Sequence, residues 1–178
     1  MVDLLLELTR RYTEPHRHYH GLPHIAAMLA AGRGFPLDTV QTMAVWFHDA
    51  IYDARSKTNE ADSAALARER LAAAGWNAAD IDAVARIVLD TKMHVPSSPG
   101  SAPVLDLDLM SLAVPWPEFA ANTAAIRAEY AFVPDADFVV GRRAFFQAML
   151  QRERLFFTPW GAALEPLARA NLQRAVAG

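Results

Sequence analysis

Apolar residues recur at helical spacing along almost the whole chain, whereas the strict alternation typical of strands is rare. We therefore expect an all-α fold, a single-domain helical bundle of about seven to nine helices. The pattern predicts helices over residues 3–14, 23–33, 36–53, 59–75, 78–94, 115–130, 135–152 and 159–176.

The helix predicted over residues 36–53 is the most unusual of these. It contains the run AVWFHDAIY, residues 44–52, which places His48 and Asp49 side by side among apolar neighbours. A buried carboxylate without a partner costs several kcal/mol. A protein group or a metal ion must therefore compensate Asp49.

Residue types at the predicted boundaries support the helices. Pro36 opens the helix that contains His48. Pro23 suits the first turn of its helix and places His24 just inside it. Thr58 is the expected N-cap of the helix that begins at residue 59, and either Asn77 or the turn before it is expected to cap the next one.

Composition narrows the class of protein. A chain of 178 residues with 53% hydrophobic residues can form one domain, here residues 1–178, with a substantial core. No apolar run reaches the ~18–20 residues that span a bilayer. The acidic N-terminus lacks the basic region of a signal peptide. We therefore expect a cytoplasmic protein that makes no membrane contact.

The cysteine content and the net charge exclude further kinds of site and of binding partner. The chain has no cysteine, which excludes disulfides and thiolate metal sites. Its net charge of −3 argues against binding to a nucleic-acid polymer. Phosphate loops and the sequence motifs of zinc proteases and serine hydrolases are also missing.

Four polar residues stand in apolar surroundings and could form one site: His24, His48, Asp49 and Asp108. Imidazole and carboxylate groups are ligands for a divalent ion, and four of them leave open positions in an octahedral shell. A water molecule on such an ion ionises near neutral pH, and Asp49 could also accept its proton. A single buried histidine is more often a structural hydrogen-bonding group, so the ordered combination is what favours a metal site.

The ordered pattern H…HD…D resembles the HD-domain superfamily of metal-dependent phosphohydrolases. Within it, the chain is similar to a bacterial branch of predicted metal-dependent hydrolases. The similarity covers nearly the whole chain, in segments 17–25, 46–53, 59–64, 91–94, 105–109, 127–130, 141–142 and 165–172.

The resemblance implies one divalent ion (Mn, Co, Ni, Fe, Zn or Mg) held by the same four residues. Asp106 is the alternative to Asp108, and its other interpretation is a cap or an ion-pair partner. A second ion is disfavoured, because His94 is the only histidine between the His48–Asp49 pair and Asp108.

Further candidates would act on the substrate. Relatives often place an acid shortly after the pair, which suggests a catalytic role for Glu60, although a first-turn acid also stabilises its helix. Cationic and imidazole side chains could neutralise or contact a phosphoryl group, with a solvated or structural role as the alternative for each. These are Arg17, His20, Lys92, His94 and Arg142.

The leading hypothesis is thus a metal-dependent phosphohydrolase that cleaves a phosphomonoester or phosphodiester, with nucleotides among the candidate substrates. The first alternative is a sensor that binds metal and nucleotide without turnover. The second is a structural bundle in which His48 and Asp49 pair with protein groups. The sequence leaves the oligomeric state open.

Overall fold

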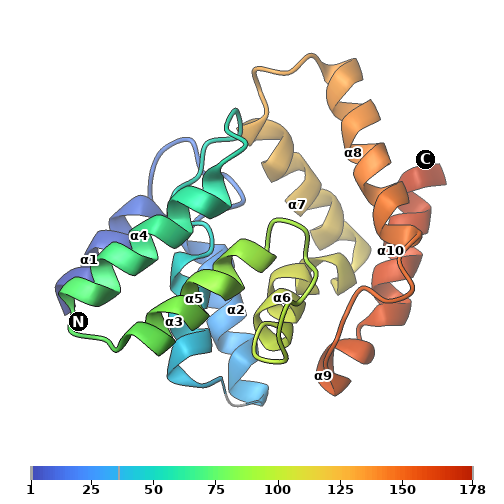
Figure 1. Ribbon diagram of the computed structural model, residues 1–178. Coiled ribbons are helices and arrows are strands. Elements are labelled where there is room, and N and C mark those ends of the chain that lie inside the picture. Colours follow the sequence, from blue (N-terminus) through green and yellow to red (C-terminus); the bar gives the residue numbers. More distant parts are fainter. Residues whose placement is uncertain (1, 36, 178) are drawn as a thin grey trace.

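The chain folds into helices joined by turns and loops (Figure 1). The computed structural model describes residues 2–35 and 37–177, and these residues contain no strand. The all-α prediction is therefore confirmed. No helix within the described ranges is long and apolar enough to cross a membrane.

The first half of the chain contains α1 (Val2–Arg11), α2 (Leu22–Ala31), η1 (Gly32–Gly34), α3 (Thr39–Phe47), α4 (Asn59–Ala73) and α5 (Ala78–Asp90). The second half contains α6 (Ala102–Leu109), η2 (Met110–Ala113), α7 (Trp116–Glu129), α8 (Asp135–Leu150), α9 (Pro159–Ala162) and α10 (Glu165–Ala177).

The described residues thus form ten α-helices, and the expected range of seven to nine was too low. The helix predicted over residues 159–176 is two elements, because α9 ends after one turn and α10 begins at Glu165. The acidic stretch at residues 105–109 belongs to a helix of its own, α6.

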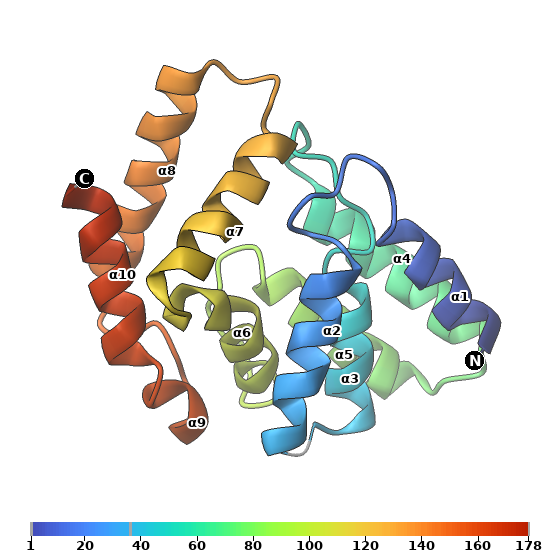
Figure 2. The same ribbon diagram turned by 180° about the vertical axis from the view of Figure 1, so that it is seen from behind.

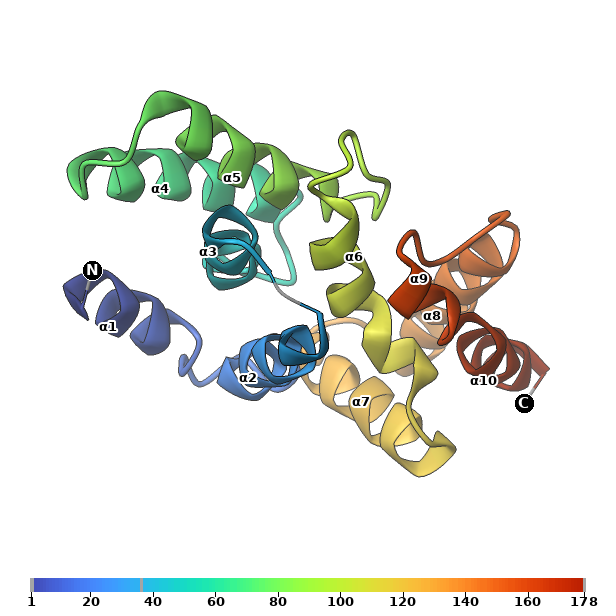
Figure 3. The same ribbon diagram turned by 90° about the horizontal axis from the view of Figure 1, so that it is seen from below.

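The helices form two groups, each around its own hydrophobic cluster (Figures 2 and 3). Helices α1 to α5 surround the first cluster, in which α5 packs against α3 and α4. Helix α10 packs against α8 and η2 around the second. Helix α6 lies between the groups: Val104 and Leu107 belong to the first cluster and Leu109 to the second. Residues of α6 are therefore placed at the junction of the two halves.

The prediction that His48 and Asp49 lie inside a helix was wrong. Helix α3 begins at a capping box formed by Asp38 and Gln41 and ends at Phe47, so both residues belong to the turn that follows. Pro36, the expected first residue of this helix, lies outside the described residues. The helix stops because side chains take up its next hydrogen bonds: Asp49 N donates to Tyr12 Oη, and the Val45 carbonyl bonds to His48 Nδ1.

Other boundaries follow the sequence closely. Asn77 caps α5 by accepting a hydrogen bond from Asp80 N at 2.9 Å, as predicted. Pro23 lies in the first turn of α2, which places His24 inside that helix. Thr58 precedes α4 but makes no capping hydrogen bond, because its hydroxyl donates to the Asp62 carboxylate.

Candidate metal centre

Four side chains from three separate segments converge where the two halves meet. His24 Nε2 lies 3.2 Å from Asp108 Oδ1, and His48 Nε2 lies 3.1 Å from Asp49 Oδ2 and 3.7 Å from Asp108 Oδ1. One ligand atom from each of His24, His48 and Asp49 fits within 4.8 Å of the others, so these three could hold a metal ion. Asp108 is close to both imidazoles and offers a fourth ligand.

His48 has the orientation that a metal ligand needs. Its Nδ1 bonds to the Val45 carbonyl at 2.9 Å, an acceptor that fixes the proton of a neutral ring on Nδ1. The Nε2 lone pair then points into the site. This atom is fully buried, and among the described residues its contact with Asp49 Oδ2 at 3.1 Å is an ion-pair contact that lacks hydrogen-bond geometry. A divalent ion would satisfy it, so the residues present fit the group that the sequence predicts.

The charges at this point influence one another strongly. Burial would lower the pKa of His48, but the carboxylates of Asp49 and Asp108 outweigh it and raise the pKa to about 9. Burial would raise the pKa values of both acids, but the neighbouring imidazoles hold them well below the usual range. Without an ion, the positive charge of a protonated His48 compensates the carboxylates of Asp49 and Asp108 and holds the cluster together.

Two buried side chains fix the turn that carries Asp49. Arg17 donates to the carbonyls of His20 at 3.1 Å, Asp49 at 2.6 Å and Ala50 at 3.1 Å. Tyr12 Oη accepts from Asp49 N at 3.2 Å. The structure therefore places Arg17 beneath the site, with its guanidinium occupied by main-chain oxygens, and not in the wall of the adjoining cavity.

Glu129, at the end of α7, holds the histidine-rich loop. Its Oε1 accepts hydrogen bonds from the backbone N–H groups of His18, Tyr19 and His20 at 2.7–2.9 Å. Its Oε2 bonds to His20 Nδ1 at 2.6 Å and to Tyr52 Oη at 2.9 Å. His20 is thus committed to Glu129, and its ring stacks on Tyr52 with centroids 4.3 Å apart. This places His20 beside the metal centre, at the edge of the cavity.

His94 approaches the site from the opposite side. Its Nε2 lies 3.1 Å from Asp108 Oδ2. Among the described non-glycine residues it alone has a positive φ, 47°, a conformation that costs energy in an L-residue. Arg152 holds this turn by donating to the carbonyls of Met93 and His94. The backbone is therefore fixed in an unfavourable state that directs the imidazole at Asp108.

Asp106 and Asp108 point in different directions from the same helix. The Asp106 carboxylate is fully buried and accepts hydrogen bonds from the N–H groups of Phe157 and Thr158, at 2.8 and 2.7 Å, and from the Thr158 hydroxyl at 2.6 Å. It therefore ties the segment before α9 to α6. Asp108 alone of the two faces the histidines, which agrees with the preference drawn from the sequence.

A cavity of about 610 Å³ opens over the metal centre. Asp49, His94 and Asp108 line one part of it, together with Glu60 and Lys92. Lys92 Nζ lies 3.3 Å from Glu60 Oε2 and donates to the Lys57 carbonyl at 2.7 Å. The structure thus brings Glu60 and Lys92 together at the wall, as one partly exposed ion pair.

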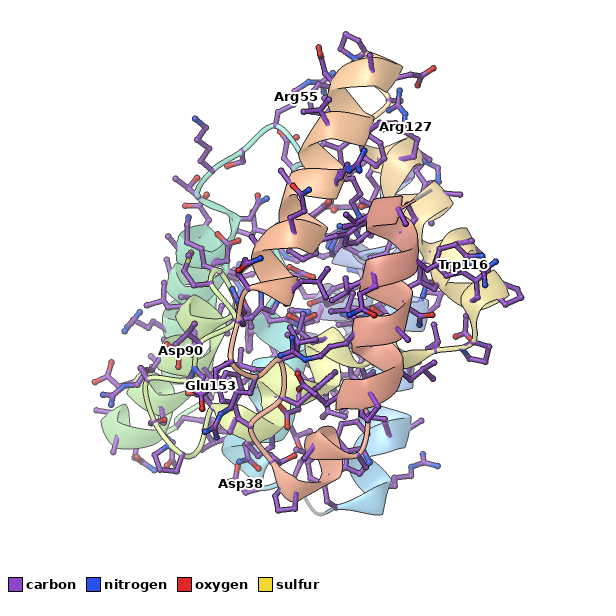
Figure 4. All side chains as sticks on the ribbon, turned by 90° about the vertical axis from the view of Figure 1, so that its right-hand side faces the viewer. Asp38, Arg55, Asp90, Trp116, Arg127 and Glu153 are labelled. Carbon is purple, nitrogen blue, oxygen red and sulfur yellow. The ribbon has the colours of Figure 1, made fainter. Side chains whose placement is uncertain are left out.

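At one end of the molecule the α3–α4 loop contacts the α7–α8 turn, and Ser56 and Val133 from these two segments line the cavity. Arg55 and Arg127 both lie at this end of the molecule (Figure 4). The Arg55 guanidinium lies 4.2 Å from the centroid of Phe132, and Arg127 pairs with Asp135 at 2.6 Å. These contacts attach α8 to the rest of the cavity wall.

For two residues of the site, the structure shows a larger role than the sequence indicates. Glu129 is not among the candidates drawn from the sequence, because no local pattern indicates that it binds a loop more than a hundred positions away. Arg142 was one of several cationic candidates. Its signal is an arginine in an aromatic-rich helix, close to Phe145 and Phe146.

Comparison of the chain with family models, with curated proteins and with solved structures gave no match.

Proposed function

We propose that the protein is a metal-dependent phosphohydrolase of the HD type that cleaves a phosphomonoester or phosphodiester. The observation that supports it most is the convergence of two imidazoles and two carboxylates beneath an open cavity: His48 Nε2, fully buried, lies 3.1 Å from Asp49 Oδ2 and 3.7 Å from Asp108 Oδ1, and His24 Nε2 lies 3.2 Å from Asp108 Oδ1. An ion at this position satisfies Nε2 and both acids at once.

His24, His48, Asp49 and Asp108 would hold the ion. When bound, such an ion polarises the phosphoryl group and makes water a nucleophile near neutral pH. The four residues contribute two negative charges, which balance those of a divalent ion, so cationic side chains of the cavity wall are needed to compensate the charge of an anionic substrate. His94, bonded to Asp108 Oδ2, orients that carboxylate.

The cavity wall supplies the remaining groups. Lys92 Nζ, on a flexible side chain, can neutralise a phosphoryl oxygen. Glu60 Oε2 can take the proton that water releases as its oxygen attacks phosphorus and the ester P–O bond breaks. His20 keeps its place through Glu129 and contacts the substrate at the rim.

The experiment measures metal content and hydrolysis in the same samples. Purified protein is incubated with Mn²⁺, Co²⁺, Ni²⁺, Fe²⁺, Zn²⁺ or Mg²⁺ and assayed with an aryl phosphate, a bis-aryl phosphodiester and nucleotides. We expect about one ion per chain and metal-dependent release of product. Asp108→Asn should lose the ion and the activity, whereas Asp106→Asn, two residues earlier on the same helix, should keep the ion.

Each alternative gives a different result. Metal and nucleotide binding without any product would replace the hydrolase with a sensor. A protein that binds no ion, and whose melting temperature is the same in chelator and in metal, would refute the metal site altogether.

A further inference from the structure

The wall of the cavity contributed by α8 carries an arginine with no partner. Arg142 lines the cavity, its Nε is buried, and that atom has no hydrogen-bond partner. No carboxylate within the described ranges forms an ion pair with its guanidinium. A largely desolvated cation without an anion is costly, so the site is built for something that the chain itself does not provide.

Aromatic rings fix the guanidinium in place. Its Cζ lies 4.9 Å from the ring centroid of Phe145 and 4.6 Å from that of Phe146, both on α8. The phenols of Tyr19, Tyr52 and Tyr130 are close enough to act on its pKa, which burial lowers. The cation is therefore preorganised, which reduces the entropy lost on binding a ligand.

The chemistry of the free edge points to an oxyanion. A guanidinium presents Nε–H and a terminal N–H as a parallel pair, which matches two oxygens of a carboxylate or phosphate. The aromatic contacts leave the Nε edge unused. An uncharged ligand would leave the buried charge uncompensated.

Arg142 is separate from the charges of the metal centre. The groups that act on its pKa besides burial are the three phenols, and no carboxylate is among them. Tyr19 lies between the two regions: its ring centroid is 5.3 Å from that of the metal-site residue His24, and it faces the cavity next to Arg142. Lys92, the other cation that lines the cavity, is already paired with Glu60.

We propose that the Arg142 guanidinium is a subsite for a second anionic group of the substrate, a phosphate or a carboxylate, distinct from the phosphoryl group that reacts at the metal centre. That this anion belongs to a substrate rests on the proposed function. The subsite itself rests on the cavity, the aromatic contacts and the unpartnered Nε. The substrate class is then a phosphoester whose leaving group bears its own negative charge.

Binding of stable phosphonates tests the subsite without requiring turnover. Alkane bisphosphonates of increasing chain length and phosphonocarboxylates are titrated by calorimetry into the Mn²⁺-loaded protein, each against the alkylphosphonate of the same length. When the chain length matches the distance between the metal site and Arg142, the second anion should raise the affinity of the probe over that of the alkylphosphonate by about tenfold to a hundredfold. The two families of probe tell which oxyanion fits better.

Variants on α8 assign the effect to one side chain. Arg142→Met, which keeps the length and the aromatic packing, should abolish the advantage of the second anion and leave alkylphosphonate binding unchanged. Arg143→Met, at the next, exposed position, should change neither. In chelator, where the alkylphosphonate can bind only at Arg142, its affinity should fall in Arg142→Met.

The outcomes separate this proposal from the proposed function. Equal affinities for one and two anions at every length, or an advantage that survives in Arg142→Met, overturns the subsite even if the protein hydrolyses esters. If phosphonate binding depends on Arg142 but the protein binds no metal and hydrolyses no ester, the subsite is supported and the hydrolase function is refuted.

Discussion

Replacing Glu129 by glutamine tests how the histidine-rich loop is held. The Glu129 side chain is 1% exposed, and its carboxylate accepts five hydrogen bonds, three of them from the backbone. Burial would raise its pKa, but the bonds from His20 and the backbone N–H groups lower it from 4.5 to about 2. A difference of this size corresponds to about 3 kcal/mol of folding free energy, which Glu129→Gln should lose at pH 7.

The pH dependence follows from the sign of this shift. Because the folded state lowers the pKa, the stabilisation is fully present above pH 4.5 and is lost as the pH falls through 2. At pH 3 the difference between wild type and Glu129→Gln should have shrunk to about 1.4 kcal/mol. The wild type should therefore lose stability more steeply than the variant in acid.

Urea unfolding followed by circular dichroism at pH 7, 4.5 and 3 measures the difference. Glu118→Gln is the matched control, since Glu118 is an exposed acid on the same helix, and it should change stability by about 0.5 kcal/mol or less. A difference for Glu129→Gln that is equal at pH 7 and pH 3 would refute the ionised carboxylate as the source of the stability.

Four further substitutions test the residues that hold the site in place. Asp106→Asn should lower the free energy of unfolding by about 1–3 kcal/mol, because one of its two acceptor oxygens becomes an amide NH2 group that faces a backbone N–H donor, and mass spectrometry should find the same metal content as in the wild type. Gly161→Ala should cost about 1–3 kcal/mol in urea unfolding, since a methyl group there would collide with the Asp106 carboxylate; Gly141→Ala, with open space around it in α8, should stabilise by about 0.5–1 kcal/mol. Arg17→Met should cost roughly 3 kcal/mol or more and weaken metal binding in the same titration, because the turn at Asp49 loses its hydrogen-bond donors; unchanged metal affinity would contradict that role.

The fold could be predicted from the sequence wherever residues close in the chain determine the start and end of a helix. Helical periodicity and punctuation by proline and asparagine located most helices, including α7 and α5 within a few residues. The end of α3 could not be predicted this way. The run around His48 is helical by pattern, and hydrogen bonds between its backbone and the side chains of Tyr12, Arg17 and Ser63, which are distant in the sequence, hold it as a turn.

The site shows the same division. Side chains that combine polarity with apolar surroundings, such as His24 and His48, are conspicuous in the sequence, and the structure brings them together. The choice between Asp106 and Asp108 depends on which face of α6 meets the histidines, which requires the packing of both halves. Arg17 looked like a phosphate ligand because its charge is visible in the sequence, whereas its main-chain acceptors are not.

The bond between Glu129 and the loop at His18 joins residues 111 positions apart in the chain. Closing so long a segment is entropically unfavourable until the intervening helices have formed. The histidine loop should therefore become ordered late in refolding, after the transition state. A bound ion would then slow unfolding and leave the refolding rate almost unaltered.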